Sequence, residues 1–142
     1  MRLVDANVLL YAVNERSEQH QRSRAWLDAA LNGQEAVGFA WIALLAFLRL
    51  ATHPAVFPRP LSVGDAIETL RQWLAQPPAM IVDPTSRHAD VLAGLLTETG
   101  TAGNLVNDAH LAALAVEHGA VLVSFDADFS RFPGIRWEPP AV

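Results

Sequence analysis

The sequence predicts an α/β fold in which helices cover both faces of a mostly parallel sheet. Short apolar segments of strand type alternate with longer segments of helical period, and no repeat or polar linker interrupts them. Because parallel strands are buried on both faces, each side of the sheet needs a helical layer. We therefore expect a three-layer α/β/α sandwich that forms one domain over residues 1–142, with 51% hydrophobic residues to supply its core.

The strands are recognised as short apolar runs, and the helices as longer amphipathic stretches with capping or stop residues at their ends. The expected strands are 2–5, 36–40, 80–82, 120–124 and an edge strand at 135–137. The expected helices begin near residue 7 and then occupy 18–31, 41–51, the stretch from Ser62 to the Pro77-Pro78 pair, 86–99 and 104–118.

Several residues define where these helices begin and end. Ser62 is followed three residues later by Asp65, the pattern of a capping box. Gly100 and Gly119 each follow a helical stretch and are expected to end it, because glycine adopts the left-handed conformation found after helices. Asn104 is expected to cap the last long helix.

Composition excludes several functional classes. The chain has no cysteine, so disulfides, thiolate nucleophiles and zinc–cysteine sites are ruled out. All ten basic residues are arginine, and a P-loop or a receiver-type site would need a lysine. The net charge of -5 argues against non-specific adhesion to nucleic acid, although a local arginine patch can still grip phosphate. No membrane span or signal peptide is recognisable, so we expect a cytoplasmic protein with no membrane partner.

Three aspartates are placed where they can share a site. Asp5 follows the first strand, Asp126 follows the strand at 120–124, and Asp108 lies near the start of a helix, one turn after Asn104. In open α/β sheets, ligands bind beyond the carboxyl ends of the strands. Carboxylates gathered there repel one another unless a hard cation such as Mg²⁺ or Mn²⁺ binds them. Asp5 taken alone is equally well explained as a helix cap.

At these residues the chain resembles the PIN-domain ribonucleases, specifically the VapC-type toxins of bacterial toxin–antitoxin pairs. The resemblance covers nearly the whole length and is specific only through the order and spacing of its motifs. These are Asp5-Ala-Asn-Val-Leu-Leu-Tyr-Ala, Phe47-Leu-Arg49-Leu-Ala-Thr52, Asn104-x-x-x-Asp108-Ala-x-Leu-Ala-Ala and Ser124-Phe-Asp126-x-Asp-Phe129.

The resemblance implies hydrolysis of an RNA phosphodiester with Mg²⁺ (or Mn²⁺) as cofactor. Asp5, Asp108 and Asp126 are the catalytic and metal-binding residues that it implies. Arg49, Asn104 and Ser124 are candidates for binding the substrate, although Arg49 can instead form a salt bridge and Ser124 can instead hydrogen-bond a carboxylate. Asp128 is either a nearby acid or a turn residue. The five histidines lack tight metal-ligand spacing and are read as structural or surface residues.

One departure from the family pattern concerns the helix at 41–51. The family usually carries a glutamate where this chain has Ala46, so one of four expected acids is missing. Glu15 or Glu18 is a possible but weaker substitute. The alternative function is therefore a catalytically impaired module that binds RNA or protein.

The family precedent also implies partners: a homodimer and a cognate antitoxin that binds an apolar groove. Candidate aromatic anchors for that contact are Trp41, Phe47, Phe57 and Trp73, and candidates for a wider RNA footprint are Arg22, Arg24 and Arg59.

Overall fold

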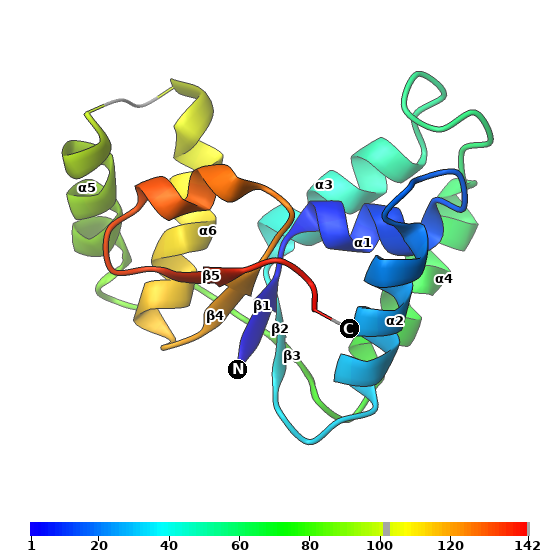
Figure 1. Ribbon diagram of the computed structural model, residues 1–142, viewed down its shortest axis with the longest axis horizontal. Helices are drawn as coiled ribbons and strands as arrows, with labels where there is room; N and C mark the ends of the chain where they lie inside the picture. Colours follow the sequence, from blue (N-terminus) through cyan, green and yellow to red (C-terminus); the bar gives the residue numbers. More distant parts are fainter. Residues whose placement is uncertain (101–102, 142) are drawn as a thin grey trace.

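The fold is built on a five-stranded sheet in which every pair of neighbouring strands is parallel (Figure 1). The computed structural model describes residues 1–100 and 103–141, apart from the side chain of Asn104. The strand order is β3-β2-β1-β4-β5, with β1 in the centre. The strands are β1 (Arg2–Val4), β2 (Val37–Phe39), β3 (Ala79–Ile81), β4 (Val121–Val123) and β5 (Arg136–Glu138). All five predicted strands are confirmed, and the two edge strands, β3 and β5, are each shifted by one residue.

Helices cover both faces of the sheet, as the three-layer prediction requires. Four helices, α1 to α4, share one buried cluster with the sheet, whereas α5 and α6 share a second cluster with its other face (Figure 1). The helices are α1 (Ala6–Val13), α2 (His20–Leu31), α3 (Trp41–Ala51), α4 (Val63–Leu74), α5 (His88–Thr99) and α6 (Val106–Glu117), with 3-10 turns η1 (Gly103–Leu105) and η2 (Ala127–Arg131).

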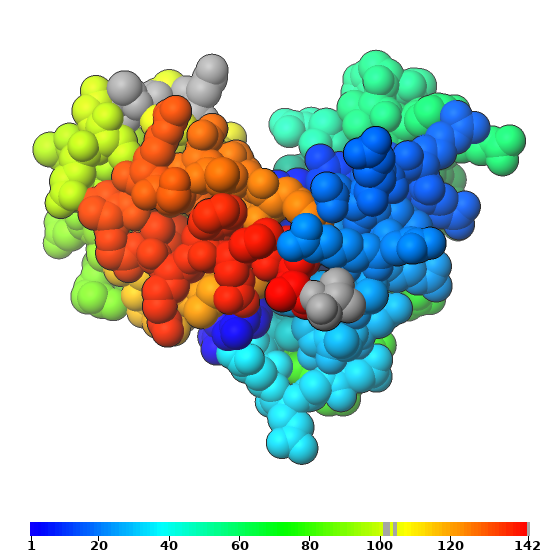
Figure 2. Space-filling model, in the orientation of Figure 1, coloured from blue at the N-terminus to red at the C-terminus, as the bar shows by residue number. Residues whose placement is uncertain are grey.

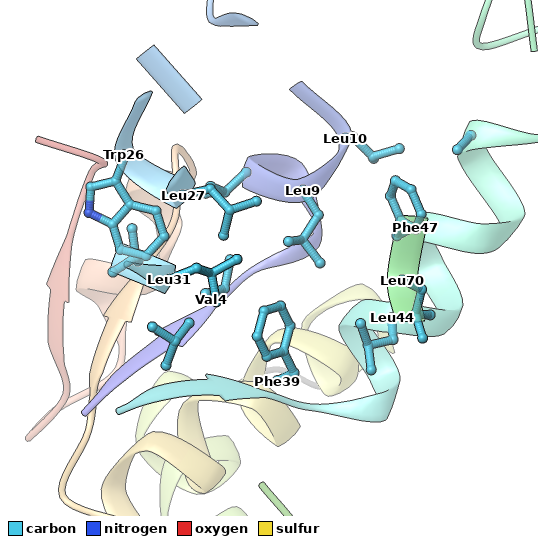
Figure 3. Packing of buried hydrophobic residues seen from close by; sticks show 14 of the residues in the cluster. Val4, Leu9, Leu10, Trp26, Leu27, Leu31, Phe39, Leu44, Phe47 and Leu70 are labelled. Atoms are coloured by element: carbon cyan, nitrogen blue, oxygen red, sulfur yellow. The ribbon is translucent and has the colours of Figure 1, made fainter. Parts of the chain in front are cut away.

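The strand residues alternate between the two cores, because successive side chains of a strand point to opposite faces. In the central strand, Leu3 packs against α5 and α6, whereas Val4 packs against the four N-terminal helices. Figure 3 shows the cluster shared by α1 to α4, in which Val4 and Phe39 of the sheet lie toward Leu9 of α1 and Leu44 of α3. This two-sided burial explains the continuous apolar character of the strand segments.

The predicted helix ends are mostly confirmed. The Ser62 hydroxyl accepts a hydrogen bond from the Asp65 amide at 3.1 Å. Gly100 and Gly119 have φ values of 71° and 62°, so both adopt the left-handed conformation that ends a helix. The last long helix begins two residues later than predicted: a 3-10 turn precedes α6, and the N-cap residue of α6 is Leu105, which makes no side-chain cap bond. The cap expected from the Asn104 side chain falls outside the described part of the chain.

The structure also sorts the predicted aromatic anchors. Phe47 is fully buried, Phe57 is 5% exposed, and the Trp73 ring stacks edge-on against Phe47 with 4.8 Å between centroids. These three belong to the core or pack against it, whereas Trp41 is 46% exposed. None of the helices in the described part of the chain is long and apolar enough to cross a membrane.

Close packing of the central strands predicts the effect of substituting Gly38. A Cβ at this position in β2 would lie 2.7 Å from Cγ2 of Val82, a buried side chain. We expect Gly38→Ala to lower the free energy of unfolding by about 1–3 kcal/mol, the usual cost of overpacking a core.

The matched control is Gly94→Ala on the exposed side of α5, where an added Cβ meets nothing within 4 Å. This change is expected to raise stability by about 0.5–1 kcal/mol, because alanine favours the helix. Urea denaturation of both variants measures the difference, and equal effects would contradict the packing argument.

Candidate active site

The site is built where β1 and β4 end side by side. The two strands pair in register from Arg2 opposite Val121 to Val4 opposite Val123, so Asp5 and Ser124 follow as neighbours. The Ser124 hydroxyl donates a hydrogen bond to Oδ2 of Asp5 at 2.7 Å. The other oxygen of Asp5 accepts from the amide of Ala6 at 2.7 Å, which makes Asp5 the N-cap of α1. Both readings of Asp5, helix cap and site carboxylate, therefore apply to the same side chain.

Asn7 completes this hydrogen-bond network and was not predicted from the sequence. Its amide nitrogen donates to the Ser124 hydroxyl at 3.1 Å, and its carbonyl oxygen accepts from the amide of Phe125 at 3.3 Å. The same hydroxyl accepts from the amide of Asp126 at 3.0 Å. The only sequence signal is that Asn7 lies two residues after Asp5, because the contact itself depends on strand pairing.

The network also corrects the prediction that Ser124 binds substrate. Its side chain is fully buried and its proton is directed at Asp5, so it cannot contact a ligand in the cleft. The alternative, that Ser124 hydrogen-bonds a carboxylate, is confirmed.

Helix α6 brings Asp108 to the same place from the other side. Asp5 and Asp108 line one cleft of about 460 Å³ between α3 and α6, and Figure 2 shows a hollow between the yellow-to-orange and teal-to-green parts of the surface. Ala46 and Arg49 of α3 also line this cleft, three residues apart on one face of the helix. The remaining lining residues are Ala6, Ile42, Ala43, Leu45, Asn107 and Leu111.

Uncompensated negative charge characterises this site. Burial, and then the negative charges of Asp5, Asp126 and Asp128, raise the pKa of Asp108 from its ordinary value of 3.8 to about 6. Burial also raises the pKa of Asp5; the hydrogen bonds from Ser124 and Ala6 oppose this effect and the charge of Asp126 adds to it. Within residues 1–100 and 103–141, no arginine or histidine forms an ion pair with Asp5, Asp108 or Asp126.

The carboxylates do not form a closed metal cage. Among the described residues, no group of three or more His, Asp or Glu side chains is arranged so that it could hold a metal ion. Asp126 does not line the cleft, and its side chain caps η2 by accepting from the amide of Asp128 at 2.9 Å. The donors that do face the cleft, Asp5 and Asp108, still suit Mg²⁺, which keeps several waters and needs only one or two carboxylates plus a substrate phosphate.

The remaining predicted residues are distributed as follows. Asp128 is exposed in the first turn of η2 and lies 3.8 Å from Arg131, which agrees with a turn role. The Asn104 side chain lies outside the described part of the chain. Two of the arginines proposed for an RNA footprint have other partners: Arg22 donates to the carbonyl of Pro140 at 2.5 Å, and Arg24 lies 3.8 Å from Asp28.

Two histidines, His88 and His110, connect helices and do not line the cleft. His110 points away from Asp108, and its Nδ1 lies 2.9 Å from Nε2 of His88. The other ring nitrogen of His88 lies 2.5 Å from Oε2 of Glu117. This chain of contacts connects α5 to α6, which supports the structural reading of these two histidines.

Comparison with known proteins agrees with this geometry. The family model described as PIN domain matches residues 2–135. Ribonuclease VapC37 of Mycobacterium tuberculosis is 62% identical, and the match covers 100% of this chain and 99% of that protein.

Two solved structures share the fold. They are VapBC2 from Rickettsia felis bound to a DNA fragment (TM-score 0.67, 20% identity, 97% of each chain) and a toxin–antitoxin complex from Klebsiella pneumoniae (TM-score 0.65, 18% identity, 99% and 98%).

A parallel α/β sheet with aspartates gathered beyond its carboxyl end defines the class as a PIN domain. The chain belongs to the PIN family and, within it, to the VapC ribonucleases, the toxins of toxin–antitoxin systems. This membership favours the enzyme over the non-catalytic alternative.

The raised pKa of Asp108 predicts how stability depends on pH in the absence of divalent cations. An acid whose pKa is higher in the folded than in the unfolded chain resists ionisation when folded, so its ionisation costs folding free energy. The free energy of unfolding should therefore fall as pH rises from 3.8 to about 6. Because the half-exposed carboxyl is partly screened by solvent, Asp108→Asn should remove only about 1–2 kcal/mol of this loss and be more stable than wild type at neutral pH.

Urea denaturation in EDTA across this pH range measures the effect, with Asp83→Asn as the control at an exposed aspartate outside the cleft. If the free energies of unfolding of Asp108→Asn and wild type depend on pH in the same way, ionisation of Asp108 does not destabilise the folded chain.

Proposed function

We propose that this ribonuclease hydrolyses RNA phosphodiesters with Mg²⁺ or Mn²⁺, and that Asp5, Asp108 and Asp126 form its catalytic and metal-binding site. One observation carries the proposal: Asp5 and Asp108, from opposite sides of the sheet, face the same cleft without a basic partner among the described residues. Burying like charges together is costly unless a cation binds them.

The two cleft aspartates suit different tasks. Both oxygens of Asp5 accept hydrogen bonds, which favour the charged form and hold the carboxylate in one orientation. Asn7 and Ser124 act as positioning residues for it. Asp108 faces the cleft beside Asp5, so its carboxylate would help to hold the cation or accept the proton of an attacking water. A bound divalent cation would polarise the scissile phosphate and acidify a bound water.

Other residues complete the proposed reaction. Arg49 faces the acids across the cleft and binds a phosphate of the substrate, since its guanidinium fork matches phosphate oxygens. Asp126 lies close enough to raise the pKa of both cleft aspartates and so adds to the field that attracts a cation. Asn104 stays a candidate for contact with the substrate.

We also propose that the protein acts in the cytoplasm as a homodimer restrained by a cognate antitoxin. The relatives named as VapC ribonucleases and the Klebsiella pneumoniae toxin–antitoxin complex of the same fold support this assignment. Copurification with the product of an adjacent gene is the direct test.

Substitution of the cleft acids tests the catalytic proposal. Asp5→Asn and Asp108→Asn each keep the size of the side chain, and each should lower the rate of Mg²⁺-dependent RNA cleavage by at least about 100-fold, because charge stabilisation in the transition state is lost. Gel assays with single-stranded RNA, with Mg²⁺ and with EDTA, measure this rate. Asp83→Asn is the matched control and should cleave like wild type. Cleavage that persists in EDTA and in both variants would sink the mechanism.

A second experiment asks what the missing acid at position 46 does. Because Ala46 lines the cleft with Asp5 and Asp108, Ala46→Glu adds a carboxylate ligand at the wall that has none. We expect Mn²⁺ to bind about tenfold more tightly, since affinity for hard cations follows the number of charged ligands. Isothermal titration calorimetry measures this, with Ala46→Gln as the uncharged control of the same length. Equal Mn²⁺ affinity in both variants would place the metal away from this wall.

A further inference from the structure

One wall of the cleft differs in chemistry from the rest. Asp5 and Asp108 lie on the side formed by α1 and α6, whereas the α3 side contributes Ile42, Leu45 and Arg49. Because Ala46 stands in the middle of this wall, α3 brings no carboxylate to the cleft. A polyanion in the cleft is therefore repelled from one wall and attracted to the other.

Exposed side chains extend this wall beyond the cleft. Trp41, Leu45 and Arg49 are spaced by four residues, so they form one stripe along α3. Trp41 is 46% exposed and Leu45 58% exposed, and Arg49 is also exposed. Trp41 begins the helix directly after β2, which places it at the same edge of the sheet as Asp5. Helices usually bury such large apolar residues, so the stripe suggests a binding role.

We propose that this stripe is the substrate-binding wall, on which a base of single-stranded RNA stacks against the Trp41 indole while Arg49 holds a phosphate. The proposal rests on the proposed function, because it starts from a scissile phosphate bound beside Asp5 and Asp108. Leu45 and Arg49 line the cleft where that phosphate lies, and Trp41 precedes Leu45 by four residues, a rise of about 6 Å along the helix. The next nucleotide along the strand thus reaches the indole.

Single-stranded RNA is the occupant that this combination of groups favours. An aromatic face accepts any unstacked base, and a neighbouring arginine neutralises the backbone, which is the usual design of single-strand binding grooves. Paired RNA keeps its bases stacked inside the helix and offers none to Trp41. Within the described residues Arg49 has no carboxylate partner, so its charge is available for phosphate.

The test separates stacking from charge. A labelled unstructured RNA of about ten nucleotides is titrated by fluorescence anisotropy in Mg²⁺ against the slow-cutting Asp108→Asn protein over a range of salt concentrations. Added to this background, Trp41→Ala should weaken binding about 5- to 100-fold with no change in the salt slope, and Trp41→Phe should recover most of the loss. Arg49→Gln should weaken binding and lower the slope of log K against log salt by about 0.7.

Two controls test the stacking contact, one through a variant of the protein and one through a modified RNA. Val63→Ala removes another exposed apolar side chain, 71% exposed and outside the cleft, and should bind RNA like its parent. An abasic RNA, which lacks the bases, should bind the parent protein as weakly as intact RNA binds Trp41→Ala. For Trp41→Ala itself, abasic and intact RNA should bind with the same affinity. Unchanged unfolding midpoints confirm that the variants are folded.

Three outcomes would overturn the inference. The first is that Trp41→Ala binds intact RNA as tightly as Val63→Ala does. The second is that Trp41→Ala discriminates intact from abasic RNA as well as its parent does. The third is that the effect of Trp41→Ala is confined to self-association or to binding of a protein partner, which would make the stripe a protein interface. The proposed function is judged separately: if wild type cuts no RNA with any divalent cation, that function fails, whatever the binding titrations show.

Discussion

The parallel pairing of β1 with β4 is the constraint on which the rest of the site depends. This register puts Ser124 beside Asp5, and the 2.7 Å hydrogen bond between them directs one carboxylate oxygen. Asn7 and the amide of Asp126 hold the serine hydroxyl in turn. A shift of this strand pairing by one residue would move every side chain of the strand to the other face of the sheet, which would disrupt both buried clusters and the site. Fold stability and site geometry therefore share one cause.

The carboxylates around the Asp5–Ser124 hydrogen bond carry an electrostatic cost. Burial and mutual repulsion raise the pKa of Asp108 to about 6, and no arginine or histidine in the described part of the chain forms an ion pair that relieves it. Arrangements of this kind cluster at functional sites because they are retained for chemistry rather than stability. The α3 wall offers the complementary character, apolar and basic. The cleft therefore has one acidic wall and one apolar and basic wall, and the proposed mode of RNA binding depends on this asymmetry.

Some features were predictable because they depend on local physics. The helix at 41–51 was located correctly from its apolar character and the proline beyond it, and the glycine ends at Gly100 and Gly119 follow from the conformations that only glycine adopts easily. The start of α6 was predicted too early, because a 3-10 turn precedes the helix and helix propensities do not distinguish such a turn from the helix itself. The exposure of the aromatic side chains was predicted least well: of the four aromatic anchors, only Trp41 is exposed.

The sequence by itself determined the class of fold and the carboxylates available for a site, because these depend on periodicity, residue type and motif spacing. The absence of an acid at position 46 came from the resemblance to the PIN domains, which usually carry a glutamate there. Only the tertiary structure decided what each residue does. Strand pairing made Ser124 a buried positioning residue and recruited Asn7 from beside Asp5. The packing of α6 opposite α3 brought Asp108 to the cleft and left Asp126 beside it. Contacts between residues more than a hundred positions apart depend on how whole elements pack, which no local pattern records.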